Sequence, residues 1–296
     1  MTFTAYESSR KSGSPVSLLL FRVGTGDNSY FAYTNHSQEI FFDDGSGLGE
    51  IGYQPIAIQH GKIQTTGNLD KTRLDIRMPN NVGLAQYLKG TFPSRVVTCV
   101  IFSGHVNDPD QEYPAAWTGR ILGASNQPPE LVLTGELSIT AMRRTGLRRH
   151  WQIGCPHLLY DQEDGSCKAD MSAATVTATV ASVSGGTVTL VAGWNGAFAA
   201  AKFQNGGRLE WDTVDEGDHE IRTIRRVSGD VLTLNAPPRA LTAGMTVSVL
   251  LGCNHQKTDC AELHKETGTG NPNIVNYGGQ TRIPTASPLG LRNNYF

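Results

Sequence analysis

The sequence predicts a mainly β protein: an antiparallel β-rich N-terminal domain with one short helix, followed by a C-terminal domain that contains an inserted small β-barrel. The 33 glycines and 14 prolines in 296 residues form a turn-rich composition, which favours many short strands over long helices. The apolar residues fall in short runs rich in β-branched and aromatic side chains, as is typical of strands. This length is sufficient for about two domains, and we place them at residues 1–150 and 151–296.

The composition excludes two classes of function. Lysine and arginine number 25 against 27 aspartates and glutamates, so the net charge of −2 supplies no basic field to attract nucleic acid or anionic lipid. No apolar run approaches the roughly 18 residues of a membrane span, and the N-terminus, MTFTAYESSRKSGSP, lacks the pattern of a signal peptide. We therefore expect no membrane span and no sequence-specific nucleic-acid binding, in a chain made in a cytoplasm where thiols stay reduced.

The elements of the N-terminal domain follow in order from the turns between them. DDGSGLGE (43–50) and TTGN (65–68) supply turn residues between the first apolar runs. NVGLAQYLKG (81–90) predicts the helix, with Asn80 or Asn81 as its N-cap and Gly90 at its end. The predicted strands are 15–23, 29–34, 38–42, 55–66, 72–78, 95–104, 115–124 and 130–138.

A second strand series, from about 171 to 251, predicts the inserted barrel. Two hairpins turn at Ser184-Gly185-Gly186 and at Ser228-Gly229-Asp230, and their sequences VASVSGGTVTL and IRRVSGDVLTL are similar. A duplicated hairpin within a small barrel explains this similarity. The final stretch, 267–296, is rich in Gly, Pro and Asn, and we expect it to be an extended C-terminal tail that packs on a neighbouring subunit.

An arginine group lies near the junction of the two domains. We interpret it as a solvated or interface-facing strand-to-helix corner. An arginine cluster between two domains also suits pairing with carboxylates across a subunit interface. The lining of a channel is the alternative. The group consists of Arg143, Arg144, Arg148 and Arg149, followed by His150.

Four of the five cysteines bracket the predicted barrel. Cys155 and Cys167 precede it, and Cys253 and Cys260 follow it. Since the ends of an inserted domain lie close together, folding of the insert would bring the two pairs next to each other. Closing the longer loop adds only about 2 kcal/mol, whereas a metal site supplies on the order of 10 kcal/mol. Cys99 lies within the predicted strand VVTCVIF, and we expect it in the core.

The cysteine spacing leaves the nature of the site open. Zinc sites usually contain a tight C-x2–4-C pair, which neither cysteine pair has. Four irregularly spaced thiolates fit a cubane iron–sulfur cluster at least as well, since each binds a different iron. Buried cysteines that pack as small apolar residues are the third interpretation. His157 and His255 each lie two residues after a cysteine and could replace a thiolate, but we expect them to hydrogen-bond around the site instead.

The residues around these cysteines resemble those of the tail hub proteins of long-tailed bacteriophages. The resemblance lies in CPHLLYD (155–161) followed by Cys167, in GCN (252–254) followed by Cys260, and in NIVNYGGQTRIP (273–284). The family comprises tail-tip or baseplate hubs, including the lambda tail-tip protein L and the hub of gene transfer agents. Lys168 stands where the family often has glycine, and Leu263-His264 where it often has an aromatic residue.

The resemblance implies a structural virion protein rather than an enzyme. It implies a [4Fe-4S] cluster held by Cys155, Cys167, Cys253 and Cys260, with zinc as the alternative metal. It also implies a homotrimer at the tail tip or baseplate of the virion, assembled in the host cytoplasm. The implied partners are a distal tail protein, the tape-measure protein and a central tip or fibre protein.

Other functions have less support in the sequence. The G-x-S-x-G, H-E-x-x-H and Walker A motifs are absent, so no catalytic function is indicated. The alternative function is that of an iron–sulfur redox or sensor protein. A carbohydrate-binding surface would depend on Trp117, Trp151, Trp194 and Trp211, which we expect in the core instead.

Overall fold

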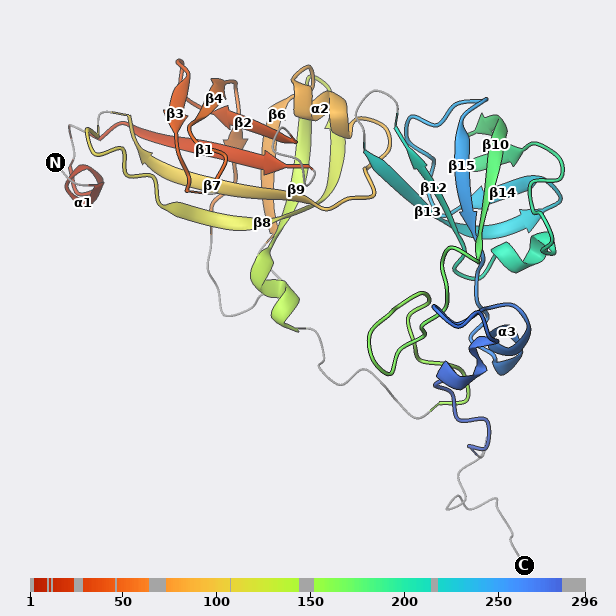
Figure 1. The fold of residues 1–296 in the computed structure, drawn as a ribbon. Helices are drawn as coiled ribbons and strands as arrows, with labels where there is room; N and C mark the ends of the chain where they lie inside the picture. The colour runs from red at the N-terminus through yellow and green to blue at the C-terminus, as the bar shows by residue number, and fades with distance from the viewer. Residues whose placement is uncertain are drawn as a thin grey trace, which may run out of the picture. The chain divides into compact units, whose positions relative to one another are not determined.

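The computed structural model describes residues 3–9, 11, 13–23, 29–45, 47–63, 73–106, 108–143, 152–213 and 218–283 (Figure 1). The chain divides into two compact units, residues 1–145 and 146–296. The first contains a large sheet and the second a closed barrel, which confirms the mainly β fold class. No helix in the described ranges is long and apolar enough to cross a membrane.

A nine-stranded sheet forms the first unit, in the order β3-β4-β2-β1-β7-β8-β9-β6-β5. Its strands are β1 (Pro15–Arg22), β2 (Tyr30–Thr34), β3 (Ile40–Phe42), β4 (Ile51–Pro55), β5 (Gln59–His60), β6 (Arg73–Pro79), β7 (Val97–His105), β8 (Ala115–Gln127) and β9 (Glu130–Leu137). The described helices of this unit are α1 (Phe3–Glu7), α2 (Gly83–Leu88) and the 3-10 helix η2 (Ser138–Arg143).

Strand β1 is buried on both faces of this sheet. Leu19 and Phe21 enter one apolar core, to which α2 also contributes. Leu18 and Leu20 point the other way, into a second core with Tyr53. A strand covered on both faces has no polar side, which explains why the apolar residues of β1 run on without alternation.

Two strands of this unit differ from the sequence prediction. β2 and β4 pair in parallel, with Tyr33 opposite Gln54, so the sheet is not wholly antiparallel. Of the predicted strand 55–66, Pro55 is the last residue of β4 and Gln59–His60 form β5, while 56–58 and 61–63 are not in strands and 64–66 lie outside the described residues. Both differences depend on pairing between distant segments, which a local run of apolar residues does not specify.

The helix predicted at 81–90 is present as α2, and Gly90, with φ of +92°, follows its end. The predicted Asn80 or Asn81 cap is wrong, because the N-cap residue is Val82 and makes no side-chain hydrogen bond. The N–H of Leu84 instead donates to the hydroxyl of buried Tyr33 at 3.0 Å. A hydroxyl from the sheet thus satisfies a first-turn N–H group that a capping side chain would otherwise serve.

A closed six-stranded barrel forms the core of the second unit, in the order β10-β11-β14-β13-β12-β15. Its two ends are adjacent: Thr175 lies opposite Leu250, and the Leu251 N–H donates to the Ala174 carbonyl at 3.0 Å. The inserted small barrel is therefore present. Its strands are β10 (Thr175–Ser184), β11 (Thr187–Leu190), β12 (Arg208–Asp212), β13 (His219–Ser228), β14 (Val231–Leu234) and β15 (Thr246–Leu250).

The barrel contains an internal repeat. The hairpins β10–β11 and β13–β14 turn where the sequence predicts, and Gly185 and Gly229 open the two turns with φ of +55° and +60°. The pair Val180–Leu190 recurs 44 residues later as Ile224–Leu234, and each hairpin has the same irregularity directly after this pair. Since β11 also pairs with β14, the two copies lie side by side in the barrel wall.

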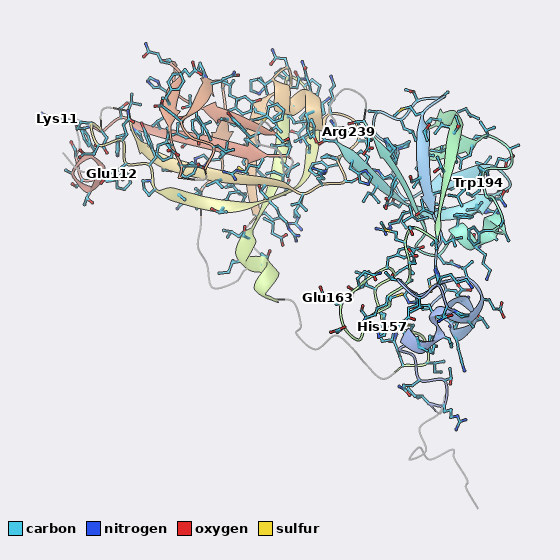
Figure 2. All side chains as sticks on the ribbon, viewed as in Figure 1. Lys11, Glu112, His157, Glu163, Trp194 and Arg239 are labelled. Atoms are coloured by element: carbon cyan, nitrogen blue, oxygen red, sulfur yellow. The ribbon has the colours of Figure 1, made fainter. Side chains whose placement is uncertain are left out.

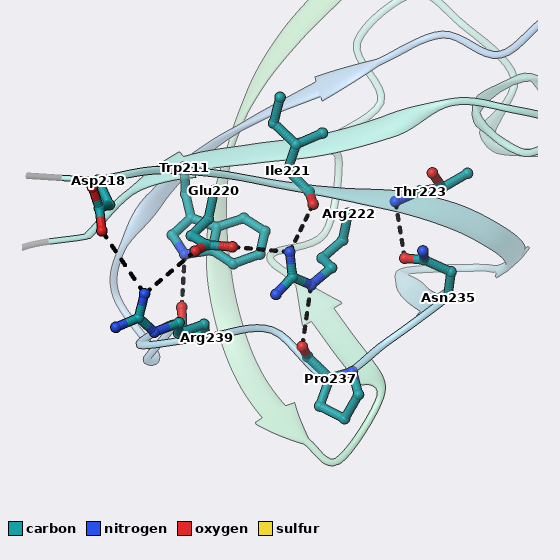
Figure 3. Close-up of polar contacts among 9 residues, drawn as sticks. All are labelled: Trp211, Asp218, Glu220, Ile221, Arg222, Thr223, Asn235, Pro237 and Arg239. Atoms are coloured by element: carbon teal, nitrogen blue, oxygen red, sulfur yellow. Dashed lines mark hydrogen bonds and ion pairs between the residues drawn. The ribbon is translucent and has the colours of Figure 1, made fainter. Parts of the chain in front are cut away.

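A buried ionic network joins β13 to the chain before β15 (Figure 3). Arg222 Nη1 donates to Glu220 Oε2 at 2.9 Å. Arg239 Nη1 lies 3.7 Å from the other Glu220 oxygen and 3.8 Å from Asp218 Oδ2, and the Trp211 indole donates to the Arg239 carbonyl at 3.0 Å. The two arginines and two carboxylates lie close enough to offset each other's charge, as burial requires.

Residues 267–283 differ from the extended tail predicted for 267–296. The 3-10 helix η4 (Asn273–Asn276) lies within them. The Asn273 N–H donates to the His264 carbonyl at 3.1 Å, and the Gln280 N–H to the Gln152 carbonyl at 2.8 Å. This part therefore packs on its own unit, because the same chain supplies its hydrogen-bond partners. Residues 284–296 lie outside the described residues.

We expect residues 171–251, expressed alone and without metal, to fold as a soluble β-domain. The barrel closes on its own strands and its two ends meet, so the fragment keeps most of its core and loses only the contributions of Tyr160, Cys167 and Ala169. Far-UV circular dichroism with thermal unfolding checks this. A random-coil spectrum would contradict the independence of the barrel.

Within that fragment, Leu232→Ala should lower the free energy of unfolding by about 2–5 kcal/mol, since the Leu232 side chain is fully buried. Val231→Ala is the control at the neighbouring position, where 37% of the residue is exposed, and should cost less than about 1 kcal/mol. Equal losses in the two variants would show that the fragment has not kept this core.

Candidate metal centre

The four cysteines that bracket the barrel all lie in segments joined to its ends. Cys155 and Cys167 come from the loops before β10, Cys253 follows β15, and Cys260 lies in α3 (Lys257–Glu262). All four are buried, with 3–7% of each residue exposed. Folding of the barrel therefore brings both pairs into one unit, with every thiol shielded from solvent.

His255 ties the first cysteine pair to the second. The Cys155 N–H donates to the His255 carbonyl at 2.8 Å, and the His255 Nδ1 lies 2.9 Å from the Cys155 carbonyl oxygen. The His255 N–H also donates to the Cys253 sulfur at 3.3 Å. These contacts match the hydrogen-bonding role expected of this histidine, since its ring contacts the backbone.

Cys167 is held by the segment near the C-terminus. Asn273, only 1% exposed, donates its Nδ2 to the Cys167 carbonyl at 2.7 Å and lies 3.8 Å from the Cys167 sulfur. Lys168 has φ of +51°, in the left-handed region that favours glycine, and its N–H donates to the Asp161 carbonyl at 2.8 Å. The glycine that the hub family often has at this position would adopt the same conformation without strain.

Backbone hydrogen bonds join the chain around Cys253 to residues 202–205 of the second unit. The Gly252 N–H donates to the Lys202 carbonyl at 2.9 Å, and the Cys253 N–H to the Asn205 carbonyl at 3.0 Å. These carbonyls lie in and directly after the 3-10 helix η3 (Ala200–Phe203). A Cβ at position 252 would collide with the Gln204 carbonyl oxygen, so only glycine allows this approach.

The glycines of NYGGQ have a similar function. His157 lies in the loop region near α3 (Figure 2), and its Nδ1 is 3.1 Å from the Asn276 carbonyl. A Cβ on Gly278 would collide with the His157 ring, and one on Gly279 with the Ile153 carbonyl. The Tyr277 hydroxyl donates to that same carbonyl at 2.8 Å. The motif therefore serves close packing of residues 276–279 against the loop that carries Cys155.

An aromatic pair lies beside the cysteines. The Tyr160 hydroxyl donates to the Leu251 carbonyl at 2.7 Å, and its ring packs edge-on against His264 at 5.9 Å. Burial lowers the pKa of His264, whose Nε2 lies 3.1 Å from the Gly252 carbonyl. His264 is therefore neutral at pH 7 and packs as an aromatic ring. It stands close to the position at which the hub family often has an aromatic residue.

The thiols interact electrostatically with one another. Burial raises the pKa of Cys253 to about 11, and the charges of Asp259, Cys167 and Cys155 add to this. Burial likewise raises the pKa of Cys260 to about 12, with further contributions from the other three cysteines. Without a cation Cys253 and Cys260 stay protonated at neutral pH, whereas binding a metal or cluster would ionise them and release protons.

The donor set fits a cluster by its chemistry. Among the residues that the structure describes, no three or more His, Cys, Asp or Glu side chains are grouped closely enough to hold a single metal ion. The ligands of a cubane lie farther apart than the ligands of a single metal ion, since each thiolate binds its own iron. Cys155, Cys167, Cys253 and Cys260 are the buried thiols that would hold such a cluster, and hydrogen-bond donors lie near the Cys253 and Cys167 sulfurs.

The other candidate residues that the structure describes lie in the apolar cores of the two units. Cys99 is fully buried in the core of the first unit, as predicted. Three of the four tryptophans, Trp117, Trp194 and Trp211, are 2–5% exposed and lie in the two cores, while Trp151 lies outside the described residues. The arginine group also lies mostly outside the described residues: this holds for Arg144, Arg148 and Arg149 and for His150, and the structure does not describe the side chain of Arg143.

Sequence reasoning missed two residues of this site, Asn273 and Asp259. Asn273 lies at the start of the NIVNYGG motif, which was a usable signal. Asp259 directly precedes Cys260 in a polar segment, where nothing in the sequence marks it as 3% exposed.

Comparison with known proteins points to phages. Residues 202–287, which include Cys253 and Cys260, match a family described as "Phage conserved hypothetical protein BR0599". A chain of the "Virion of native gene transfer agent (GTA) particle" has a similar structure, with a TM-score of 0.66, 16% identity and coverage of 96% of this chain and 93% of that chain. No curated protein matches the sequence. The first match relates part of the chain to a phage family, and the second shows that the chain shares its fold with a virion protein.

We expect Gly252→Ala to lower the free energy of unfolding of the full chain by about 3 kcal/mol, because the new methyl group would meet the Gln204 carbonyl. Gly186→Ala is the control, since a Cβ there has nothing within 4 Å, and should change stability by no more than about 0.5 kcal/mol. Urea denaturation followed by circular dichroism compares the two. A Gly252→Ala chain as stable as the wild type would contradict the close approach.

Proposed function

We propose that this protein is a structural virion protein: the hub at the tail tip or baseplate of a phage-type particle, where it closes the distal end of the tail. The observation that carries the proposal is the fold similarity, over nearly the whole of both chains, to a protein chain of a gene transfer agent virion. The phage family match over residues 202–287 supports it independently of the fold.

The cysteine site has a mechanical function in this proposal. Cys155, Cys167, Cys253 and Cys260 would hold a [4Fe-4S] cluster, whose four thiolate bonds cross-link the segments on both sides of the barrel. His255 and Asn273 would direct hydrogen bonds toward two of the sulfurs. The cross-link holds the loops around the barrel in place under load, without any change in oxidation state.

Assembly follows from the same proposal. The hub is a homotrimer that connects a distal tail protein and the tape-measure protein to a central tip or fibre protein. It is assembled in the host cytoplasm and resides in the virion. The edge strands of the large sheet, β3 with three residues and β5 with two, are short, which limits non-specific strand pairing before assembly.

Protein purified under anaerobic conditions should be brown and should contain about four irons per chain, because four thiolates bind four irons of the cubane. Replacing any one of Cys155, Cys167, Cys253 or Cys260 by serine should remove the colour and most of the iron. Cys99→Ser is the matched control, as the same change at a fully buried cysteine of the other unit, and should keep both.

Iron analysis and visible absorption check these variants. Stoichiometric zinc without iron would reject the cluster and leave the cross-link in place. Anaerobic virion material without any metal would reject both. A reversible redox change that a partner protein needs would favour the alternative, an iron–sulfur redox or sensor protein.

We also expect deletion of residues 284–296 to impair ring or tail assembly. The sequence of this segment has too little apolar periodicity to fold alone, so the far-UV circular dichroism of the truncated monomer should remain close to that of the wild type. Negative-stain electron microscopy of the assemblies tests this. Rings of normal number and shape from the truncated chain would contradict a role of this segment in assembly.

A further inference from the structure

Asp259 places a buried carboxylate next to the cysteine site. Its side chain is only 4% exposed, and it directly precedes Cys260 in α3. A buried anion beside thiolates is unfavourable unless specific partners offset it. The partners of Asp259 therefore indicate the role of its carboxylate.

One carboxylate oxygen closes the loop between the second pair of cysteines. Asp259 Oδ2 accepts the N–H of Asn254 at 2.9 Å. Asn254 directly follows Cys253 and Asp259 directly precedes Cys260, so this single hydrogen bond spans the whole loop from one cysteine to the other. The Asp259 side chain thus joins the two ends of the loop that carries these thiols.

The other carboxylate oxygen connects the loop to the barrel. Asp259 Oδ1 lies 3.1 Å from the Nζ of Lys202, which belongs to η3. The Lys202 carbonyl also accepts the N–H of Gly252 at 2.9 Å. Lys202 therefore holds the loop at two points, and its ammonium group is a countercharge of the buried carboxylate.

We propose that Asp259 is a positioning residue of the cysteine site, and that the Asp259–Lys202 pair sets the electrostatic field on a cluster bound there. This inference rests on the proposed function, since it concerns a bound [4Fe-4S] cluster. The carboxylate fixes the loop between Cys253 and Cys260, and its negative charge disfavours the addition of an electron to the cluster. The positive charge of Lys202 acts in the opposite direction.

The test is a redox titration of the full-length, iron-loaded protein, monitored by electron paramagnetic resonance. One electron passes from dithionite to the cluster, and no bond forms or breaks. Asp259→Asn removes the negative charge at nearly constant shape and should shift the reduction potential to a more positive value. Lys202→Met leaves the carboxylate without its countercharge and should shift the potential to a more negative value.

Glu262→Gln is the matched control, because Glu262 is an exposed carboxylate of the same helix. The reduction potential of the cluster in this variant should equal that of the wild type. Shifts of opposite sign in Asp259→Asn and Lys202→Met support the inference, because a purely structural defect has no reason to change sign between them. If Asp259→Asn does not fold, the negative shift in Lys202→Met still tests the field.

Two results separate this inference from the proposed function. An iron-loaded wild type whose potential is unchanged in both variants, or shifts in the same direction in both, overturns the inference and leaves the proposed function standing. A wild type that contains no iron in anaerobic preparations overturns the cluster itself, and the inference with it.

Discussion

The pairing of the two barrel ends is the constraint on which the second unit depends. The hydrogen bond from Leu251 to Ala174, and the pairing of β10 with β15 beside it, fix where the chain enters and leaves the barrel. The cysteine-bearing segments are joined to these two ends. One closed sheet thus brings together thiols that lie far apart in the sequence, and the entropy of closing the intervening loop is met by folding of the barrel itself.

Around the thiols, the backbone is held by polar side chains that are themselves buried. Asn273 and Asp259 are 1% and 3% exposed, and each has hydrogen bonds to the loops that carry the cysteines. Gly252 and Gly278 allow the neighbouring segments to approach where any side chain would collide. Loops supported in this way present their thiols in one arrangement, which is what ligands to a metal or cluster require.

The two comparisons cover different parts of this arrangement. The similarity in sequence to a phage family begins at residue 202 and contains the second cysteine pair with its supports, including Asp259 and Asn273. The similarity in structure to a virion protein covers nearly the whole chain at 16% identity, where fold persists after most side chains have changed. The first cysteine pair lies outside the sequence match, and the closed barrel and the hydrogen bonds of His255 connect it to the second.

The sequence by itself determined the features that depend on neighbouring residues. The apolar runs predicted most of the strands, the Gly185 and Gly229 turns predicted both hairpins, and the similarity of these hairpins predicted the repeat. Only the tertiary structure decided the parallel pairing of β2 with β4, the Tyr33 hydroxyl in place of an asparagine cap, and the packing of 267–283 on its own unit. It also decided the burial of Asp259 against Lys202. Each of these joins residues that are distant in sequence, and such contacts form only when the strands and loops that carry them have taken their places.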